Sequence, residues 1–140
     1  MKVKEVIKVI EDFAPLSIQE GWDNSGLCIG SPDAEVTSVL LGLDCTPELV
    51  DEAISCGADM IVTHHPLIFS GLKKISPDDQ VGEAVIKAIR AGISIYAAHT
   101  NADKVLAGVS GAMASRLGLE NVTILEEDGE GTGLGVVGDL

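Results

Sequence analysis

Apolar positions recur along the chain at helical spacing in several segments. The pattern predicts helices over residues 3–14, 47–56, 81–91 and 108–117. The second of these also has terminal signals, because Thr46 is a good N-cap, Pro47 suits the first helical position and Gly57 ends the segment. Pro15 ends the first helix, and glycines follow the last two.

Short apolar runs between glycine, proline and polar residues predict strands instead. They cover residues 27–30, 38–43, 58–63, 93–98 and 122–125. Strands and helices alternate at the spacing of crossover units, which predicts an α/β fold with a mostly parallel sheet flanked by helices and right-handed crossovers. We expect residues 1–125 to form one α/β metal-binding domain. Residues 126–140 are acidic and glycine-rich, and we expect a mobile tail that begins an absent second half.

Charge and composition exclude several classes of protein. The net charge of −13 argues against a groove for nucleic acid, whose phosphates bind Lys and Arg, but it does not disfavour a metal cation. No apolar run approaches the roughly 18 residues of a membrane span, and the basic N-terminus lacks the apolar region of a secretory signal. The three cysteines form no CxxC pair, which indicates reduced, semi-buried thiols in a cytoplasmic protein; a reactive or metal-binding cysteine is the alternative.

The three histidines of the chain each follow a predicted strand. His64 and His65 come after the strand 58–63, and His99 comes after the strand 93–98. Ligands of open α/β folds gather where strands end. Neighbouring residues of a regular strand point to opposite faces, but at a strand end that turns into Pro66 the two imidazoles can flank a common space. We interpret them as metal ligands; the alternative is a pair of loop residues satisfied by backbone hydrogen bonds.

Carboxylates lie near these histidines in the sequence. Asp103 follows His99 by four residues and is the natural carboxylate ligand, and Asp44 follows another predicted strand. Two ions about 3.5–4 Å apart could activate a water and clamp a phosphoryl group or a ring carbon. His99 is interpreted as a pocket residue, with direct metal ligation as the alternative.

Other motifs are interpreted as structural. Trp22 is more typical of a core than of a ligand site, and Asp23-Asn24 is more typical of a turn. Residues 133–138 match the G-x-G-x-x-G pattern, but no predicted helix follows them, so they do not indicate a dinucleotide site.

Three motifs together resemble one family. Trp-Asp-Asn-Ser-Gly-Leu at 22–27, Thr-His-His-Pro-Leu at 63–67 and His-Thr-Asn-Ala-Asp at 99–103 occur in the order and spacing of the NGG-interacting-factor-three-like dinuclear metal proteins, also called GTP cyclohydrolase I type 2 homologues. The resemblance covers the whole chain. It implies an α/β fold, two divalent ions per complete site and a ring-shaped homohexamer of dimers. It also implies that His64, His65 and Asp103 are metal ligands.

The resemblance leaves His99 in the pocket without a direct bond to metal. We expect Asn101 and Asp44 in the pocket as well, or directly behind the ligands. This chain departs from the family at Ala102, where leucine is usual, and at Ser110, where asparagine is usual. Family members also continue well beyond this length, and a histidine and a glutamate near their C-terminus complete the site. We therefore expect the chain to correspond to the N-terminal half of such a protein, with one ion per chain as an alternative to two.

Two functions are carried forward from the sequence. The first is a metal-dependent hydrolase, similar to GTP cyclohydrolase type 2, acting on a nucleotide-like or phosphorylated small molecule. In it Zn, Fe, Mn, Ni or Co would activate a water, and His99 would carry the proton. The second is a non-catalytic metal-binding scaffold or regulatory subunit with an incomplete site. Both predict a homo-oligomer, and neither predicts nucleic acid or a membrane as partner.

Overall fold

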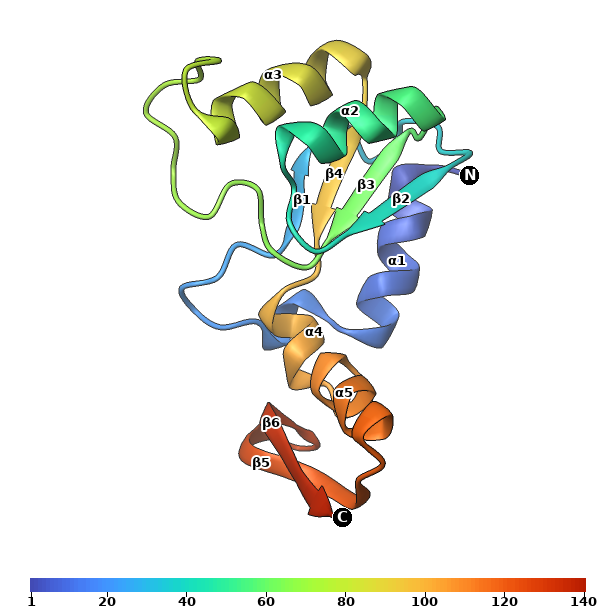
Figure 1. Cartoon of the computed structure of the whole chain (residues 1–140), viewed down its shortest axis with the longest axis vertical. Helices are drawn as coiled ribbons and strands as arrows, with labels where there is room; N and C mark the ends of the chain where they lie inside the picture. Colours follow the sequence, from blue (N-terminus) through green and yellow to red (C-terminus); the bar gives the residue numbers. More distant parts are fainter.

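Four short strands form the centre of the molecule in the computed structural model, which describes residues 1–140. They are β1 (Gly26–Ile29), β2 (Val39–Gly42), β3 (Met60–Thr63) and β4 (Ser94–Ala97). The order across the sheet is β1-β4-β3-β2, with β2, β3 and β4 parallel and β1 antiparallel to β4 (Figure 1). The predicted α/β fold with a mostly parallel sheet flanked by helices is confirmed.

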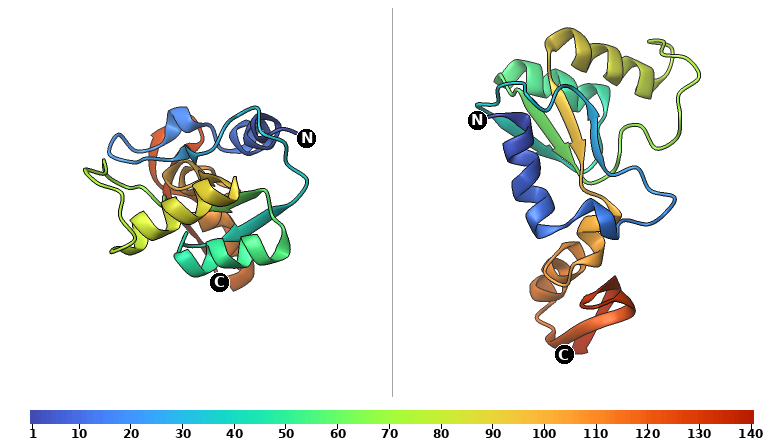
Figure 2. Two further views of the ribbon diagram at one scale, coloured as in Figure 1. Left: turned by 90° about the horizontal axis from the view of Figure 1, so that it is seen from above. Right: turned by 180° about the vertical axis from the view of Figure 1, so that it is seen from behind.

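Helices cover both faces of this sheet. Helix α1 (Val3–Phe13) lies on one face, and α2 (Pro47–Cys56) and α3 (Gln80–Ala91) lie on the other (Figure 2). Side chains of a strand alternate between faces, so neighbouring residues enter different cores. Ile61 and Ile95 belong to the cluster formed with α2 and α3, whereas Met60 and Tyr96 belong to the cluster formed with α1.

Local signals fix the ends of α2 and α3. The Thr46 hydroxyl accepts a hydrogen bond from the Leu49 N–H at 3.2 Å, and the Asp79 carboxylate accepts one from the Gly82 N–H at 2.8 Å. Gly57, after α2, has a φ of 73°, a left-handed conformation that suits a residue without Cβ. The predicted α2 is therefore confirmed at both ends, and the predicted α3 differs by one residue at its start.

The chain continues past the sheet as two helices and a hairpin. These elements are α4 (Thr100–Lys104), α5 (Val109–Leu117), β5 (Glu120–Gly129) and β6 (Thr132–Asp139). Helix α4 and the short 3-10 turn η1 (Leu16–Ile18) are absent from the sequence-based prediction, because one or two turns are too short to show a helical period. No helix combines the length and apolar character that a membrane crossing requires.

The acidic segment 126–140, for which the sequence predicts a mobile tail, forms part of a β-hairpin. The strand expected at 122–125 extends to Gly129 and pairs antiparallel with β6, so a strand crosses the predicted boundary at residue 125. Gly133 permits this pairing, since a Cβ there would lie 2.1 Å from the carbonyl oxygen of Glu126. The glycines of the G-x-G-x-x-G match thus belong to β6. The expected mobility of the segment stays a prediction.

A buried lysine connects the hairpin to the rest of the molecule. Lys104, at the end of α4, places its ammonium 2.6 Å from Glu20 Oε1 and also in contact with the carboxylate of Asp128 on β5. Val105 and Thr132 form an isolated β-bridge beside it. The hairpin lies at the opposite end of the long axis from α2 and α3 (Figure 1). Lys104 therefore joins the loop before β1, α4 and the hairpin.

Candidate metal centre

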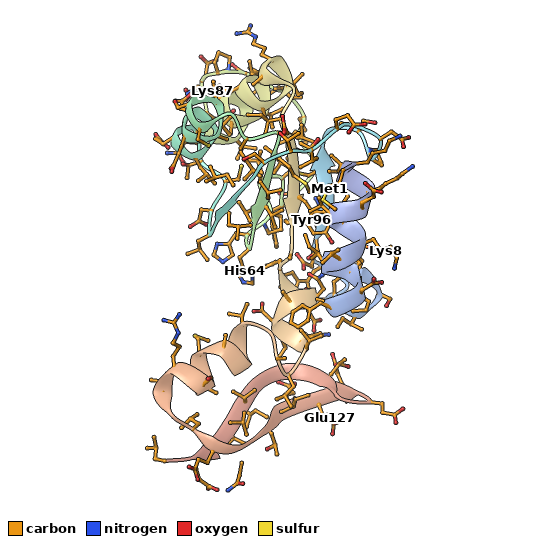
Figure 3. The ribbon with its side chains drawn as sticks, turned by 90° about the vertical axis from the view of Figure 1, so that its right-hand side faces the viewer. Met1, Lys8, His64, Lys87, Tyr96 and Glu127 are labelled. Carbon is orange, nitrogen blue, oxygen red and sulfur yellow. The ribbon has the colours of Figure 1, made fainter.

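The histidines lie together because three parallel strands end at the same edge. The backbone ladder continues past the strand ends, where the His64 N–H donates to Gly42 O at 3.3 Å and the Ala98 N–H donates to Thr63 O at 2.9 Å. These bonds hold the exits of β2, β3 and β4 side by side. Figure 3 shows His64 at this edge, between the sheet and the lower elements.

The three imidazoles form a compact cluster. Ring centroids are 4.9 Å apart for His64 and His65, 5.1 Å for His64 and His99, and 5.5 Å for His65 and His99. One nitrogen of each ring lies within 4.8 Å of the others. The two neighbouring histidines thus face a common space after the strand end, as the sequence indicated.

Each imidazole is held through its Nδ1 atom. His64 Nδ1 is 2.9 Å from the carbonyl oxygen of Ala98, His65 Nδ1 is 2.6 Å from Asp44 Oδ1, and His99 Nδ1 is 2.8 Å from Asp23 Oδ1. A carbonyl and an ionised carboxylate only accept hydrogen bonds, so each Nδ1 carries the proton. In the neutral ring the lone pair then lies on Nε2, which is the usual arrangement of a histidine that binds metal.

Two predicted carboxylates take different positions around the cluster. Asp103 Oδ1, on α4, lies 3.6 Å from His64 Nε2 and therefore beside the free nitrogen. Asp44 contacts the other nitrogen of His65 and so lies behind that ring. The roles of Asp103 as metal ligand and of Asp44 as a residue behind the ligands stay predictions, for which these positions are suitable.

The hydrogen bond of Asn101 goes to the end of α1 and not to the three histidines, and its expected place in or behind the pocket stays a prediction. Its side chain is fully buried, and its amide donates to the carbonyl oxygen of Ala14, at the end of α1, at 2.7 Å. The side-chain oxygen of Asn101 has no protein partner. The residue satisfies a helix terminus, a role that its place in the sequence motif does not reveal.

Asp23 is the residue that sequence reasoning misplaced. Its buried carboxylate accepts hydrogen bonds from His99 Nδ1, from the Ser25 hydroxyl at 2.7 Å, and from both the backbone N–H and the hydroxyl of Thr100. Burial by itself would raise the pKa of Asp23, but these bonds, together with one from the Asn24 N–H, outweigh it and hold the pKa well below its usual range. Asp23 is therefore ionised and orients His99. A turn-like Asp-Asn-Ser-Gly run carries no signal of a partner 76 residues away.

The cysteines stay outside the cluster. Burial raises the pKa of Cys28 to about 11 and is the main reason that the pKa of Cys45 is raised to about 12. Both therefore remain thiols at neutral pH, and neither belongs to the group formed by the three histidines. Cys56 is exposed and belongs to no group of metal-ligating side chains.

The donor set fits a divalent transition metal. It offers three imidazole nitrogens oriented by hydrogen bonds and one carboxylate beside them. Imidazole suits Zn, Fe, Ni and Co, and an adjacent carboxylate supplies negative charge. His64, His65 and Asp103 are the residues that would hold the ion, with His99 adjacent.

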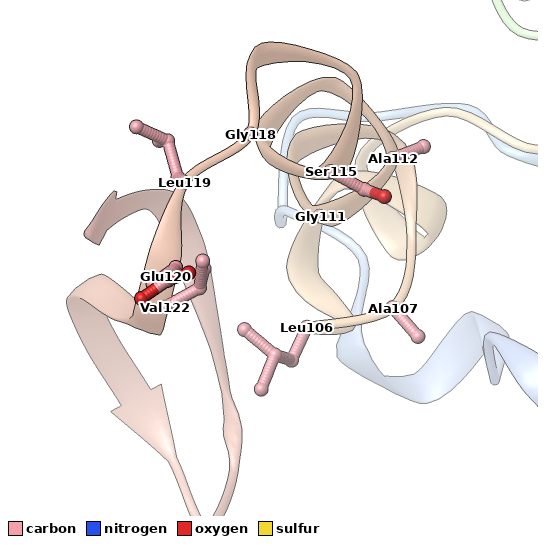
Figure 4. A pocket seen from close by; sticks show the side chains of 9 residues that line it. All are labelled: Leu106, Ala107, Gly111, Ala112, Ser115, Gly118, Leu119, Glu120 and Val122. Atoms are coloured by element: carbon pink, nitrogen blue, oxygen red, sulfur yellow. The ribbon is translucent and has the colours of Figure 1, made fainter. Parts of the chain in front are cut away.

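One hollow borders the candidate metal centre, and a second lies away from it. A cleft of about 270 Å³ borders His65 and is lined by Asp44, Cys45, Thr46, His65, Pro66, Leu67, Gln80 and Val81. A larger hollow of about 620 Å³ lies between α5 and the start of β5 (Figure 4). Its lining is largely apolar and shares no residue with the histidine cluster, so the candidate metal centre is confined to the sheet edge.

Comparison with known proteins gives a consistent result. The family model Duf34/NIF3 (NGG1p interacting factor 3) matches residues 1–140. A "GTP cyclohydrolase 1 type 2 homolog" of Clostridium acetobutylicum is 41% identical over 143 residues, an alignment that covers 100% of this chain and 53% of that protein. The chain thus spans about half the length of this curated relative.

Solved structures show the same relationship. A Bacillus cereus protein related to NIF3 superposes with a TM-score of 0.87 at 42% identity, covering 91% of this chain and 36% of that one. Reduced HcgD from Methanocaldococcus jannaschii superposes with a TM-score of 0.83 at 32% identity, covering 91% and 51%. Because the family model spans every residue and the fold agrees, the chain belongs to the Duf34/NIF3 family.

Proposed function

We propose that this protein binds a divalent metal through His64, His65 and Asp103 and uses it to hydrolyse a nucleotide-like or phosphorylated small molecule. The observation that carries the proposal is the common anchoring of three imidazoles by Nδ1, which leaves their Nε2 atoms free, that of His64 3.6 Å from the Asp103 carboxylate. The nucleotide-like substrate is supported by the name of the relatives, GTP cyclohydrolase 1 type 2 homolog.

The residues around the centre have separable tasks. A divalent ion supplies Lewis acidity and makes a nearby water more acidic. His99, oriented by the ionised Asp23, presents Nε2 to the same space and can take up and release a proton there. Asp44 keeps His65 in the tautomer that binds metal.

A second candidate function is a metal-binding scaffold that acts by assembly. The surface of 8022 Å² exceeds the about 6,900 Å² expected for a compact monomer of 14.5 kDa. Large apolar side chains are exposed on the edge strand β2 and on α5, among them Leu41 at 73% and Leu117 at 71%. Such surface favours a homo-oligomer, for which we propose a hexameric ring of dimers.

Elemental analysis of the purified protein tests the metal centre. His64, His65 and Asp103 supply three ligands and leave the fourth position of a four-coordinate ion to water, so we expect about one ion per chain. The His64→Ala/His65→Ala double variant should lose this metal while keeping its fold by circular dichroism. Asp12→Asn, a change in an exposed carboxylate paired with Lys8, is the matched control and should retain it. Wild-type protein without metal, after purification without chelator, would contradict the proposal.

Activity and assembly separate the two functions. The hydrolase predicts turnover of nucleotides or phosphoesters with Mn²⁺ or Zn²⁺, lost in His65→Ala while the oligomer persists. Metal-loaded protein that turns over no member of such a panel would refute the hydrolase and favour the scaffold.

A further inference from the structure

Two exposed aromatic side chains stand beside the histidine cluster. The chain has only four Phe, Trp and Tyr residues, and two of them, Trp22 and Phe69, contact the His99 ring with centroids 6.2 Å and 6.5 Å from it. Trp22 is 60% exposed and Phe69 is 52% exposed. The sequence-based interpretation of Trp22 as a core residue is therefore wrong, and its indole lies in solvent next to the candidate metal centre.

The two rings come from separate loops that are fastened together. Trp22 precedes β1, and Phe69 lies in the loop between β3 and α3. The Asn24 amide donates to the carbonyl oxygen of Ile68 at 2.6 Å, which joins the loops directly beside both rings. Their centroids are consequently 6.0 Å apart. Asp23, next to Trp22, is bound to His99, so the same loop is also tied to the cluster.

The ring geometry restricts what this surface can receive. Trp22 and Phe69 are inclined by 51°, whereas a ring held between two others requires them to be nearly parallel. A ligand ring would therefore lie against one aromatic face and meet the second ring with its edge. Both aromatic rings meet His99 edge-on, at 71° and 76°.

We propose that Trp22 and Phe69 form a binding surface for a flat heteroaromatic ring, whose attached polar group extends to the histidine cluster. The inference rests on the proposed function, because the surface would bind the ring of the same ligand whose polar group reaches the metal centre. Stacking on an aromatic side chain tolerates different bases and needs no charge, which suits a surface next to histidines that are contacted by the carboxylates Asp23, Asp44 and Asp103.

Fluorescence tests this proposal directly, because Trp22 is the single tryptophan. Metal-loaded protein is titrated with purine, pyrimidine, nicotinamide and flavin nucleosides. The emission of Trp22 is excited at a wavelength at which these compounds absorb little. At least one nucleoside should quench the emission saturably, and ribose 5-phosphate, which has no ring to stack, should not. Phe69→Leu should weaken nucleoside binding by about tenfold.

Matched variants and metal analysis complete the design. Phe13→Leu changes an aromatic side chain of similar exposure, 51%, at the end of α1 and should leave nucleoside binding unchanged. Trp22→Leu, followed by calorimetry, should weaken binding as Phe69→Leu does. All variants should keep the wild-type metal content, which separates this inference from the metal proposal.

The opposing outcomes are equally defined. Metal-loaded protein that no nucleoside quenches, or that ribose 5-phosphate quenches equally, overturns the inference while the metal centre stands. Emission that shifts to the blue with protein concentration, without any effect of nucleosides, overturns it in favour of self-association over these rings. Absence of metal from the wild type would instead count against the proposed function.

Discussion

Asp23 connects the loop before β1 to the candidate centre through one buried carboxylate. It accepts hydrogen bonds from Ser25, His99 and Thr100, which lie in two distant parts of the chain. Removing one partner of a buried polar network destabilises the fold by more than the average hydrogen bond contributes. The remaining buried donors then have neither a protein acceptor nor water to bond. The residue therefore stabilises the fold and orients His99 at the same time.

Asp23→Asn should lower the free energy of unfolding by about 2–3 kcal/mol near neutral pH, because an amide cannot accept all of these bonds. The pKa of Asp23 is depressed in the folded state, so its contribution is complete above the unfolded value of about 4 and is lost as pH falls further. Urea unfolding is measured from pH 7 to pH 3 with chelator present. The difference in free energy of unfolding between wild type and variant should become smaller below about pH 4.

Asp12→Asn serves as the control for this series. Asp12 pairs with Lys8 on the surface of α1, and exposed pairs of this kind contribute about 0–1 kcal/mol. If wild type and Asp23→Asn differ in free energy of unfolding by the same amount over the whole pH range, the role of the ionised carboxylate is contradicted.

At the scale of elements, the loop between β3 and α3 is held against the helix that follows it. Gly82, in the first turn of α3, is buried, and a Cβ there would lie 2.0 Å from the carbonyl oxygen of Ser76. The Asp79 cap bonds the Gly82 N–H and fixes the same junction. This close approach fixes the position at which the loop joins the start of α3. The same loop places Phe69 beside His99.

Gly82→Ala should destabilise the protein although alanine favours helices by about 1 kcal/mol. The added methyl group must displace the backbone of Ser76, for which overpacking costs of about 1–3 kcal/mol are typical. Thermal unfolding followed by circular dichroism measures the effect. Gly71→Ala, in the same loop with open space around its Cβ, should change stability by less than about 0.5 kcal/mol. A Gly82→Ala protein as stable as wild type would show that the loop moves freely away from α3.

At the scale of the whole molecule, Lys104 unites parts that share little apolar core. The two buried clusters lie on the two faces of the sheet, and the hairpin β5–β6 contributes no residue to either. Contact of Lys104 with Glu20 and Asp128 therefore contributes to the attachment of the hairpin, beside the bridge between Val105 and Thr132. Those carboxylates also raise the pKa of Lys104, which keeps the ammonium charged.

Lys104→Met should loosen the hairpin while leaving the sheet intact, because two carboxylates lose their cation near a buried position. Hydrogen exchange should become faster in β5 and β6 by about tenfold or more and stay unchanged in β3 and β4. Lys87→Met removes a lysine that also contacts two carboxylates, Asp51 and Glu83, but lies between α2 and α3, so it should leave the hairpin unaffected. Equal exchange in wild type and Lys104→Met would refute this role.

The sequence by itself determined the α/β class, the order of the main helices and strands, and the edge of the sheet at which the candidate site lies. Helical periods, the Thr46 cap and the apolar strands are local features, and they appear in the structure nearly as predicted. His64, His65 and His99 could be placed together because parallel strands bring their carboxyl ends to one edge. Asp103 was predicted as the carboxylate ligand because it follows His99 by four residues, and the resemblance to the family implies the same role.

Only the tertiary structure decided which side chains meet across long stretches of chain. Asp23 and His99 are 76 residues apart, and Asn101 turns to the end of α1, 87 residues away. Trp22 meets Phe69 because two loops are joined by one side-chain hydrogen bond, and the acidic tail becomes a hairpin through its pairing and Lys104. Such contacts depend on loop conformation and burial, which have no period along the chain, so no local pattern could predict them.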